Sequence, residues 1–138
     1  MRIFSFINLL SSTLLLVMFS GQASGSPLIA SFKTFNNVNY LSPVLNGGGT
    51  VDTQPSAVGE WERLTIEDMS GGTLNSGDQI RLKTQLGWYL VAEGGGGPGS
   101  ILRADRRLAA AWETFTIEKA GGGRISSGSV VSLRLNGY

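Results

Sequence analysis

The stretch EWERLTIE, residues 60–67, recurs as AWETFTIE, residues 111–118, a shift of 51 positions. Without a gap, the same shift carries the glycine pair at residues 71–72 onto the pair at residues 122–123. A fixed period of this length indicates one supersecondary unit that is stacked or arranged around an axis. The repeat therefore limits the choice of fold more than any other feature of the chain.

Short alternating strands make up the repeated unit. The apolar Ile80 and Leu82 alternate with Arg81 and Lys83, and apolar residues alternate with threonine in the quoted stretch as well. Alternation with a period of two is typical of half-buried strands. Runs rich in Gly, Asn and Ser separate the strands at residues 46–50, 70–73, 75–78, 94–100, 121–123 and 126–129. The pattern predicts roughly four short strands in each unit, which is an all-β arrangement.

The sequence contains two complete units and the beginning of a third. The first unit spans about residues 28–79, the second about residues 80–130, and residues 131–138 begin the third. Because the third unit is only begun, we expect open sheet edges and uncovered inner faces of Trp61, Tyr89 and Phe115. Such surfaces favour association, so we expect self-association through the incomplete third lobe.

A targeting segment precedes the repeats. Arg2 is the only charge in the first 32 residues, a largely apolar stretch follows at residues 3–19, and small residues occupy 21–26. This order is typical of a signal peptide, residues 1–25, with cleavage after Ala23 or Gly25. It predicts a secreted protein, extracellular or periplasmic, with a domain at residues 26–138.

An uncleaved membrane anchor is the alternative interpretation of the same segment. Asn8, Ser11, Ser12 and Thr13 dilute the apolar stretch below what a good spanning helix needs. Export with cleavage, and no membrane contact afterwards, is the prediction that we carry forward.

The charge balance excludes several classes of partner. The chain has 11 Lys and Arg against 10 Asp and Glu, and Arg2 lies in the leader, so the domain has no net charge. No basic block survives, which disfavours nucleic acid and anionic membranes as partners. The domain also has no cysteine, so a secreted form must be stable through its core alone.

The missing residue types narrow the chemistry. Because the chain has no His and no Cys, it cannot carry a Ser-His-Asp or Cys-His mechanism or a Cys/His zinc site. The glycine run at residues 94–100 lacks the Lys-Ser/Thr ending of a phosphate loop, so a turn is the better interpretation. Glycoside hydrolysis needs two carboxylates, but Glu62 and Glu113 belong to the repeated unit. We predict no enzyme activity, no cofactor and no metal.

Several segments resemble the fascin-like domains of the actin-crosslinking superfamily. Residues 87–97, GWYLVAEGGGG, resemble the NGKYL-AE-GGGG segment of that family, and residues 104–106, ADR, resemble its ANR triplet. Residues 112–115 match its WETF, and residues 74–82 match its L-SGD-V-LR pattern. The resemblance implies a β-trefoil, in which three four-strand units surround a pseudo-threefold axis. Six strands would form a barrel and six would form hairpins that cap it.

The resemblance implies more than one possible function. Fascin itself is an intracellular actin-bundling protein with four such domains, whereas secreted fascin-like modules accompany glycoside hydrolases. A signal peptide and a single domain argue against actin bundling. Residues 53–55, TQP, stand in the first unit where the family has its ANR triplet, so the role of that triplet is expected only in the second unit.

One tryptophan stands out as a candidate ligand platform. Tyr40, Tyr89, Trp61 and Trp112 recur in equivalent places, which predicts core positions. Trp88 precedes Tyr89 and replaces a residue that is polar in the family, so alternation along the strand predicts that it faces outward. An exposed indole suits the apolar face of a sugar ring.

The predicted ligand-binding residues are Trp88, Glu93, Arg103 and Arg106, which lie close together in the sequence. We expect a secreted, non-catalytic module that binds an oligosaccharide or polysaccharide weakly. The alternative is a protein-interaction or structural module, or a truncated remnant of a larger exported protein.

Overall fold

The structure is a computed structural model that describes residues 15–19, 28–34, 39–95 and 101–135. Within these residues the secondary structure is almost entirely antiparallel strands, and the predicted all-β class is confirmed. The elements in chain order are β1 (Leu15–Phe19), β2 (Leu28–Thr34), β3 (Ser42–Pro43), η1 (Val44–Asn46), β4 (Gly49–Asp52), β5 (Leu64–Asp68), β6 (Gln79–Lys83), β7 (Tyr89–Ala92), η2 (Glu93–Gly95), β8 (Leu102–Arg106), η3 (Ala111–Glu113), β9 (Phe115–Lys119) and β10 (Val130–Leu135).

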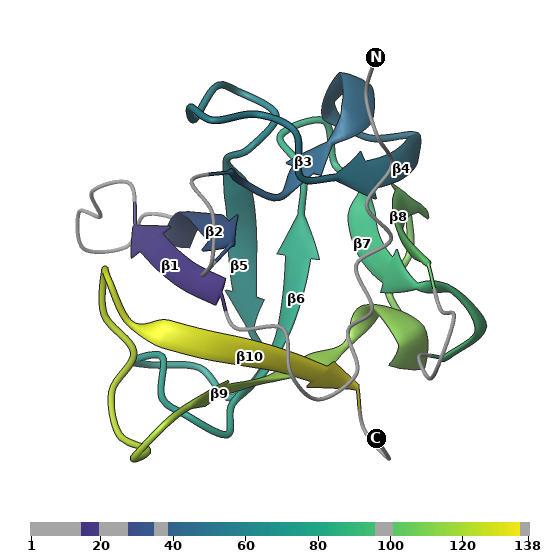
Figure 1. Ribbon diagram of the computed structural model, residues 1–138. Helices are drawn as coiled ribbons and strands as arrows, with labels where there is room; N and C mark the ends of the chain where they lie inside the picture. The colour runs from purple at the N-terminus through teal and green to yellow at the C-terminus, as the bar shows by residue number, and fades with distance from the viewer. Residues whose placement is uncertain (1–14, 20–27, 35–38, 96–100, 136–138) are drawn as a thin grey trace.

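The sheet curls until its strands pair in a ring (Figure 1). β5 pairs with β2 and β6, β9 pairs with β6 and β10, and β1 pairs with β10 and β2. The strands β1, β5 and β9 therefore alternate with β2, β6 and β10 around the ring. Each of these strands has a neighbour on both sides, which removes exposed edges from this part of the sheet.

A smaller group of strands extends the sheet from β6. β7 pairs with β6 and with β8, β8 pairs with β4, and β4 pairs with β3. The four predicted ligand-binding residues lie on or beside the β7–β8 hairpin. Arg103 and Arg106 belong to β8, Trp88 directly precedes β7, and Glu93 directly follows it. A register shift between Tyr89 and Val91 interrupts the β7–β8 ladder.

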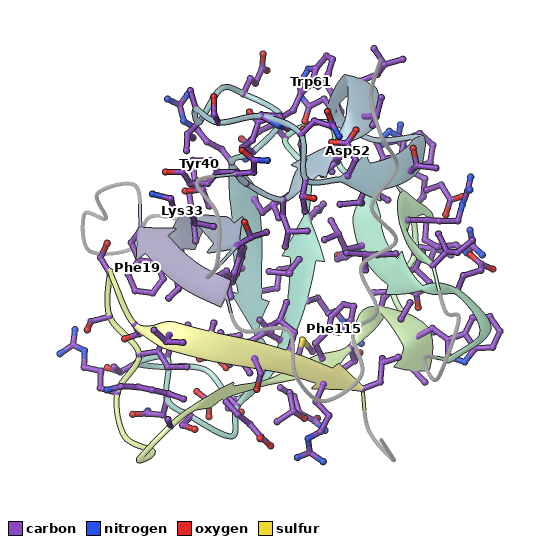
Figure 2. All side chains as sticks on the ribbon, viewed as in Figure 1. Phe19, Lys33, Tyr40, Asp52, Trp61 and Phe115 are labelled. Carbon is purple, nitrogen blue, oxygen red and sulfur yellow. The ribbon has the colours of Figure 1, made fainter. Side chains whose placement is uncertain are left out.

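The core fills the interior of the ring. Leu64 and Ile66 on β5, Leu82 on β6 and Phe115 and Ile117 on β9 are all buried. They alternate with residues that are more exposed on β5 and β6, as the sequence pattern predicts. Figure 2 labels Phe115 among the strands of the ring. Its ring is fully buried, so the expectation of an uncovered Phe115 is wrong for this structure.

The two complete copies of the repeat adopt the same turns. The backbone N–H of Gly59 donates to the carboxylate of Glu62 at 2.7 Å, and 51 residues later that of Ala110 donates to Glu113 at 2.8 Å. The N–H of Gly71 donates to the carbonyl of Asp68 at 3.2 Å, and that of Gly122 to the carbonyl of Lys119 at 2.9 Å. Gly71 and Gly122 have φ values of 72° and 71°, a conformation that favours glycine.

Strand β1 comes from the segment that the sequence assigns to the signal peptide. Residues 15–19 pair along their whole length with β2, and Val17 is fully buried in the core. The gap that the sequence predicts beside the third unit is filled by this strand. The rest of the predicted signal peptide, residues 1–14 and 20–25, and the last residues of the third unit, 136–138, lie outside the described residues.

The buried carboxylate of Glu62 gives a test of the repeated turn. Its Oε1 accepts a hydrogen bond from the Ser42 hydroxyl at 2.7 Å, and its Oε2 accepts from the Gly59 N–H. We expect Glu62→Ala to lower the free energy of unfolding by about 1–3 kcal/mol, because it leaves these donors without a partner. Glu60→Ala, a change at an exposed carboxylate in the same turn, serves as the control in urea denaturation. Equal stability of the two variants would contradict the role assigned to Glu62.

Candidate functional site

Three of the four predicted site residues meet in one ion cluster on β7–β8. Arg106 donates from Nη2 to both carboxylate oxygens of Glu93, at 2.9 and 3.0 Å, and from Nη1 to Asp105. Arg103 donates from Nε to the other oxygen of Asp105 at 2.6 Å. We call Glu93, Arg103, Asp105 and Arg106 the ion cluster. Two cations and two anions balance within it, which suits a neutral ligand better than a charged one.

The ion cluster keeps hydrogen-bonding capacity for a ligand. The side chains of Glu93 and Arg106 remain 38% and 36% exposed. A guanidinium has five N–H donors in a fixed plane, and the contacts within the cluster do not use all five on either arginine. The mutual pairing also holds the side chains in place, which lowers the entropy lost when a ligand binds.

Trp88 differs from its predicted exposed position. Its side chain is half-buried, and the guanidinium carbon of Arg107 lies 3.7 Å from the centre of its ring. Gly47 packs against the same indole with φ +112°, and a Cβ there would overlap the ring. A guanidinium over an aromatic face is a favourable cation–π arrangement. The ring is therefore covered by neighbours of its own chain, and Trp88 holds the loop at Gly47 against the β7–β8 hairpin.

The prediction that Trp112 lies in the core is wrong. This indole is 45% exposed, and it is the only aromatic side chain among the exposed large hydrophobic residues that the structure describes. A Cβ on Gly95 would sit 2.9 Å from its Nε1, so the indole lies against η2, the turn that begins with Glu93. Trp61, its counterpart in the first unit, is half-buried (Figure 2). Both tryptophans belong to the turn before a strand, where alternation does not fix direction.

The structure therefore brings an exposed indole to the turn that carries part of the ion cluster. Sequence reasoning misses Trp112 as a site residue because its recurrence with Trp61 favours a core position. The useful signal is its place three residues before β9, inside a short 3-10 turn. The glycines at 96–97 and the rest of the run to residue 100 lie outside the described residues.

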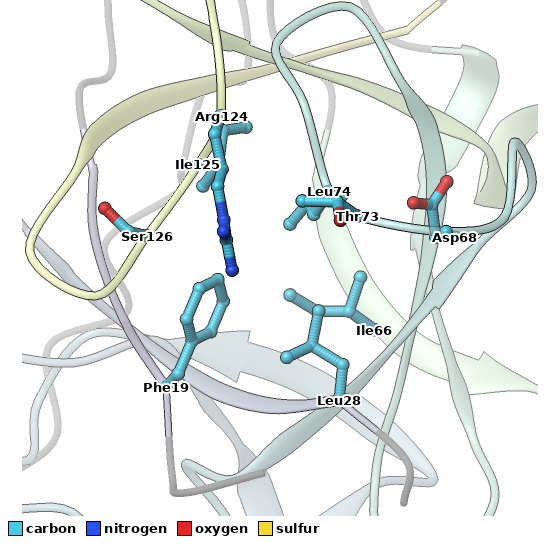
Figure 3. Close-up of a pocket in the computed structure, with 10 residues that line it drawn as sticks. Phe19, Leu28, Ile66, Asp68, Thr73, Leu74, Arg124, Ile125 and Ser126 are labelled. Carbon is cyan, nitrogen blue, oxygen red and sulfur yellow. The ribbon is translucent and has the colours of Figure 1, made fainter. Parts of the chain in front are cut away.

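A separate pocket of about 260 Å³ lies between the end of β1 and two glycine turns (Figure 3). Phe19, Leu28 and Ile66 form part of its apolar wall, and the side chain of Arg124 extends toward Phe19. Asp68 also lines it, and burial, followed by the repulsion of Asp78, raises the pKa of this carboxyl despite the N–H of Ser70. No sequence signal indicates this pocket, because it joins segments that are far apart in the chain.

Tyr89 and the repeated carboxylates Glu62 and Glu113 have structural partners. Tyr89, predicted as core, is half-buried and donates its hydroxyl to Oε1 of Glu67 at 2.8 Å, and Lys83 lies 5.3 Å from its ring centre. Glu62 and Glu113 each accept the backbone N–H that begins their own turn. In the described residues no group of three or more acidic side chains is placed to hold a metal.

The comparisons with known proteins add no family. No protein-family model matches the chain, and no curated protein matches it. Within the described residues, no helix is long and apolar enough to cross a membrane.

The hydrogen bond from Tyr89 to Glu67 has a predictable pH dependence. This bond, helped by burial, raises the pKa of Tyr89 above its ordinary value of 10.0. The folded protein thus holds the phenol proton more tightly than the unfolded chain does. The stabilisation is complete below pH 10 and is lost as the pH rises through the raised pKa. We expect Tyr89→Phe to lower the free energy of unfolding by about 1 kcal/mol at pH 7, and the difference to shrink at pH 11.

Tyr40→Phe is the matched control for this prediction. Tyr40 is half-buried and has Lys33 beside it (Figure 2), with 5.7 Å between the lysine nitrogen and the ring centre. Tyr89 has Lys83 in a similar place. We expect its stability to follow the parent protein across the same pH range in urea titrations. A Tyr89→Phe deficit that stays constant up to pH 11 would mean that the hydroxyl bond is not its source.

Proposed function

We propose that this chain is a secreted, non-catalytic binding module of fascin-like β-trefoil type and that its ligand is a neutral carbohydrate. The fold proposal is supported by the alternation of β1, β5 and β9 with β2, β6 and β10 around the ring. It is supported further by hydrogen bonds that recur after 51 residues. A fold of this kind hosts many functions, so the ligand is argued from the site alone.

The observation that carries the ligand proposal is the exposed indole of Trp112 against η2. A pyranose ring needs a flat apolar surface and a few fixed polar groups nearby. Trp112 offers the first, and Glu93, fixed by Arg106 at the start of the same turn, offers the second. The neutral balance of the ion cluster favours hydroxyl groups as its partners over an ionic ligand.

The same geometry argues against catalysis. Glu62 and Glu113 are buried and accept N–H groups from their own turns, so neither carboxylate is presented to a ligand. Glycoside hydrolysis needs two carboxylates on opposite sides of the bond to be cleaved. We propose binding without turnover of the bound sugar.

Export is part of the proposal and rests on the sequence pattern of residues 1–25. The intact mass of the secreted product tests it. A cut between Ala23 and Ser26 is expected, and a secreted protein that still contains residues 1–19 would contradict it.

Sugar binding is tested by titrating neutral oligosaccharides and measuring ligand-observed NMR signals. We expect one site with an affinity on the order of millimolar to tens of micromolar, or about −4 to −6 kcal/mol. Trp112→Ala should weaken binding at least about tenfold, because an anchoring aromatic surface is lost. Leu108→Ala is the control, because this side chain is 86% exposed and is also apolar.

Trp88→Ala separates the two possible platforms. Since Arg107 and Gly47 pack on Trp88, we expect this variant to lose stability while its folded fraction binds sugar as the parent does. A folded Trp88→Ala protein that no longer binds, beside a Trp112→Ala protein that still does, would move the site to Trp88.

Exposed leucines support protein interaction as a second candidate function. Leu86 and Leu108 are 56% and 86% exposed. Arg107, next to Leu108 in sequence, donates to the carbonyl of Leu86 at 2.6 Å. The two leucines therefore lie on neighbouring loops. The test compares the parent protein with the double variant Leu86→Ser, Leu108→Ser. If no oligosaccharide binds the parent, and the double variant binds a partner protein more weakly than the parent does, protein interaction replaces sugar binding as the proposed function.

A further inference from the structure

The contacts that hold β1 in the ring repeat those that hold β9. Val17 donates its N–H to the carbonyl of Ser129 at 3.1 Å and accepts the N–H of Gly128 at 2.8 Å. Ile117 makes the same two bonds with Asp78 and Gly77, at 3.0 and 2.7 Å. The partners Ser129 and Gly128 follow Asp78 and Gly77 by 51 residues.

A third contact extends the match. The N–H of Phe19 donates to the hydroxyl of Ser127 at 3.2 Å, and the N–H of Lys119 donates to the hydroxyl of Ser76 at 2.9 Å. Ser127 again follows Ser76 by 51 residues. The turn at residues 127–129 is therefore built to receive a strand, as the turn at residues 76–78 receives β9.

The register on the other side of β1 agrees. Val17 lies opposite Phe32 on β2, just as Ile66 lies opposite Leu82 and Ile117 opposite Leu133. All three residues that occupy this central place, Val17, Ile66 and Ile117, are apolar and buried. The position between β2 and β10 thus requires an extended segment that runs antiparallel to β2 and has an apolar residue at its centre.

β1 differs from β5 and β9 in its covalent context. Its segment lies where the sequence predicts a signal peptide, and the predicted cut at residues 23–26 would separate it from β2. Removal would leave the facing edges of β2 and β10 without partners and would uncover the core around Val17. Unpaired edges beside an apolar core recruit another strand.

We propose that the space between β2 and β10 is a strand-acceptor site that binds an extended apolar peptide once the chain is cut between β1 and β2. The ligand class is a segment of about five residues with an apolar central side chain, paired with both edges through its backbone. The N-terminal segment of this chain is the occupant present in the structure. A peptide of the same chemistry supplied by another molecule takes the same place.

The test uses the full chain with residues 21–25 replaced by the recognition sequence of a specific protease. The folded protein is cut, and size-exclusion chromatography with mass spectrometry shows whether the N-terminal fragment stays bound. A fluorescent peptide of residues 13–20, with added lysines for solubility, is then titrated against the cut protein. We expect the fragment to stay bound and the labelled peptide to displace it with saturable affinity.

Peptide variants identify the site. Replacing Val17 with Asp in the peptide should weaken binding by about 100-fold or more, because it buries a charge without a partner. N-methylation of the Val17 nitrogen should weaken it about tenfold, because it removes the bond to Ser129 and keeps the side chain. Equal affinity of the Asp peptide would overturn the proposal.

A pair of protein variants gives a matched control. Ser127→Ala removes the acceptor for Phe19 and should weaken the peptide about threefold. Ser76→Ala removes the equivalent acceptor for Lys119 and should lower stability without changing peptide affinity. If the fragment leaves on cutting and the labelled peptide does not bind, the site is not a strand acceptor. This conclusion holds whether the remaining protein unfolds, stays folded or dimerises.

Discussion

The closure of the strand ring is the constraint on which the rest of the structure depends. Every backbone N–H and C=O on the inner strands needs a partner, and a ring supplies partners on both sides only if no strand is missing. Strand β1 completes the ring by pairing with β2 and β10. The interior behind these strands holds Val17, Phe32 and Phe115, each without exposed surface. A ring that lacked β1 would expose this apolar interior and two backbone edges at once.

The repeat could be predicted from the sequence, and so could the all-β class of the fold. Residues 64–67 and 115–118 alternate between apolar and polar side chains, and the glycines at residues 71 and 122 require turns. Ring closure could not be predicted in this way. Residues 15–19 are continuously apolar, and such a run fits a signal peptide, a buried helix or a buried strand equally well. Only pairing with β2 and β10 makes it a strand.

The candidate site could be predicted only in part, because alternation along a strand fixes some side-chain directions and turns fix the others. Arg103 and Asp105 lie on one face of β8 because strand residues two apart share a face. The contact of Arg106 with Glu93 could not be predicted from the strand pairing, because Arg106 lies opposite Tyr89 and reaches Glu93 only through its long side chain. The tryptophans were harder, because their direction depends on turns. Gly47 and Arg107 cover Trp88, while the turn before β9 leaves Trp112 in solvent. The platform and the polar groups of the proposed sugar site thus come from the same unit of the repeat but from different turns, η3 and η2.

The most direct test of ring closure is amide hydrogen exchange in the full, uncut chain. Val17 donates its N–H to Ser129 as Ile117 donates its own to Asp78. Exchange of both amides therefore requires the same ring to open. The account predicts slow exchange at both positions, with protection factors of the same order. Val17 exchanging at the rate of an unfolded peptide while Ile117 stays protected would contradict the account, because β1 would then be no part of the folded ring.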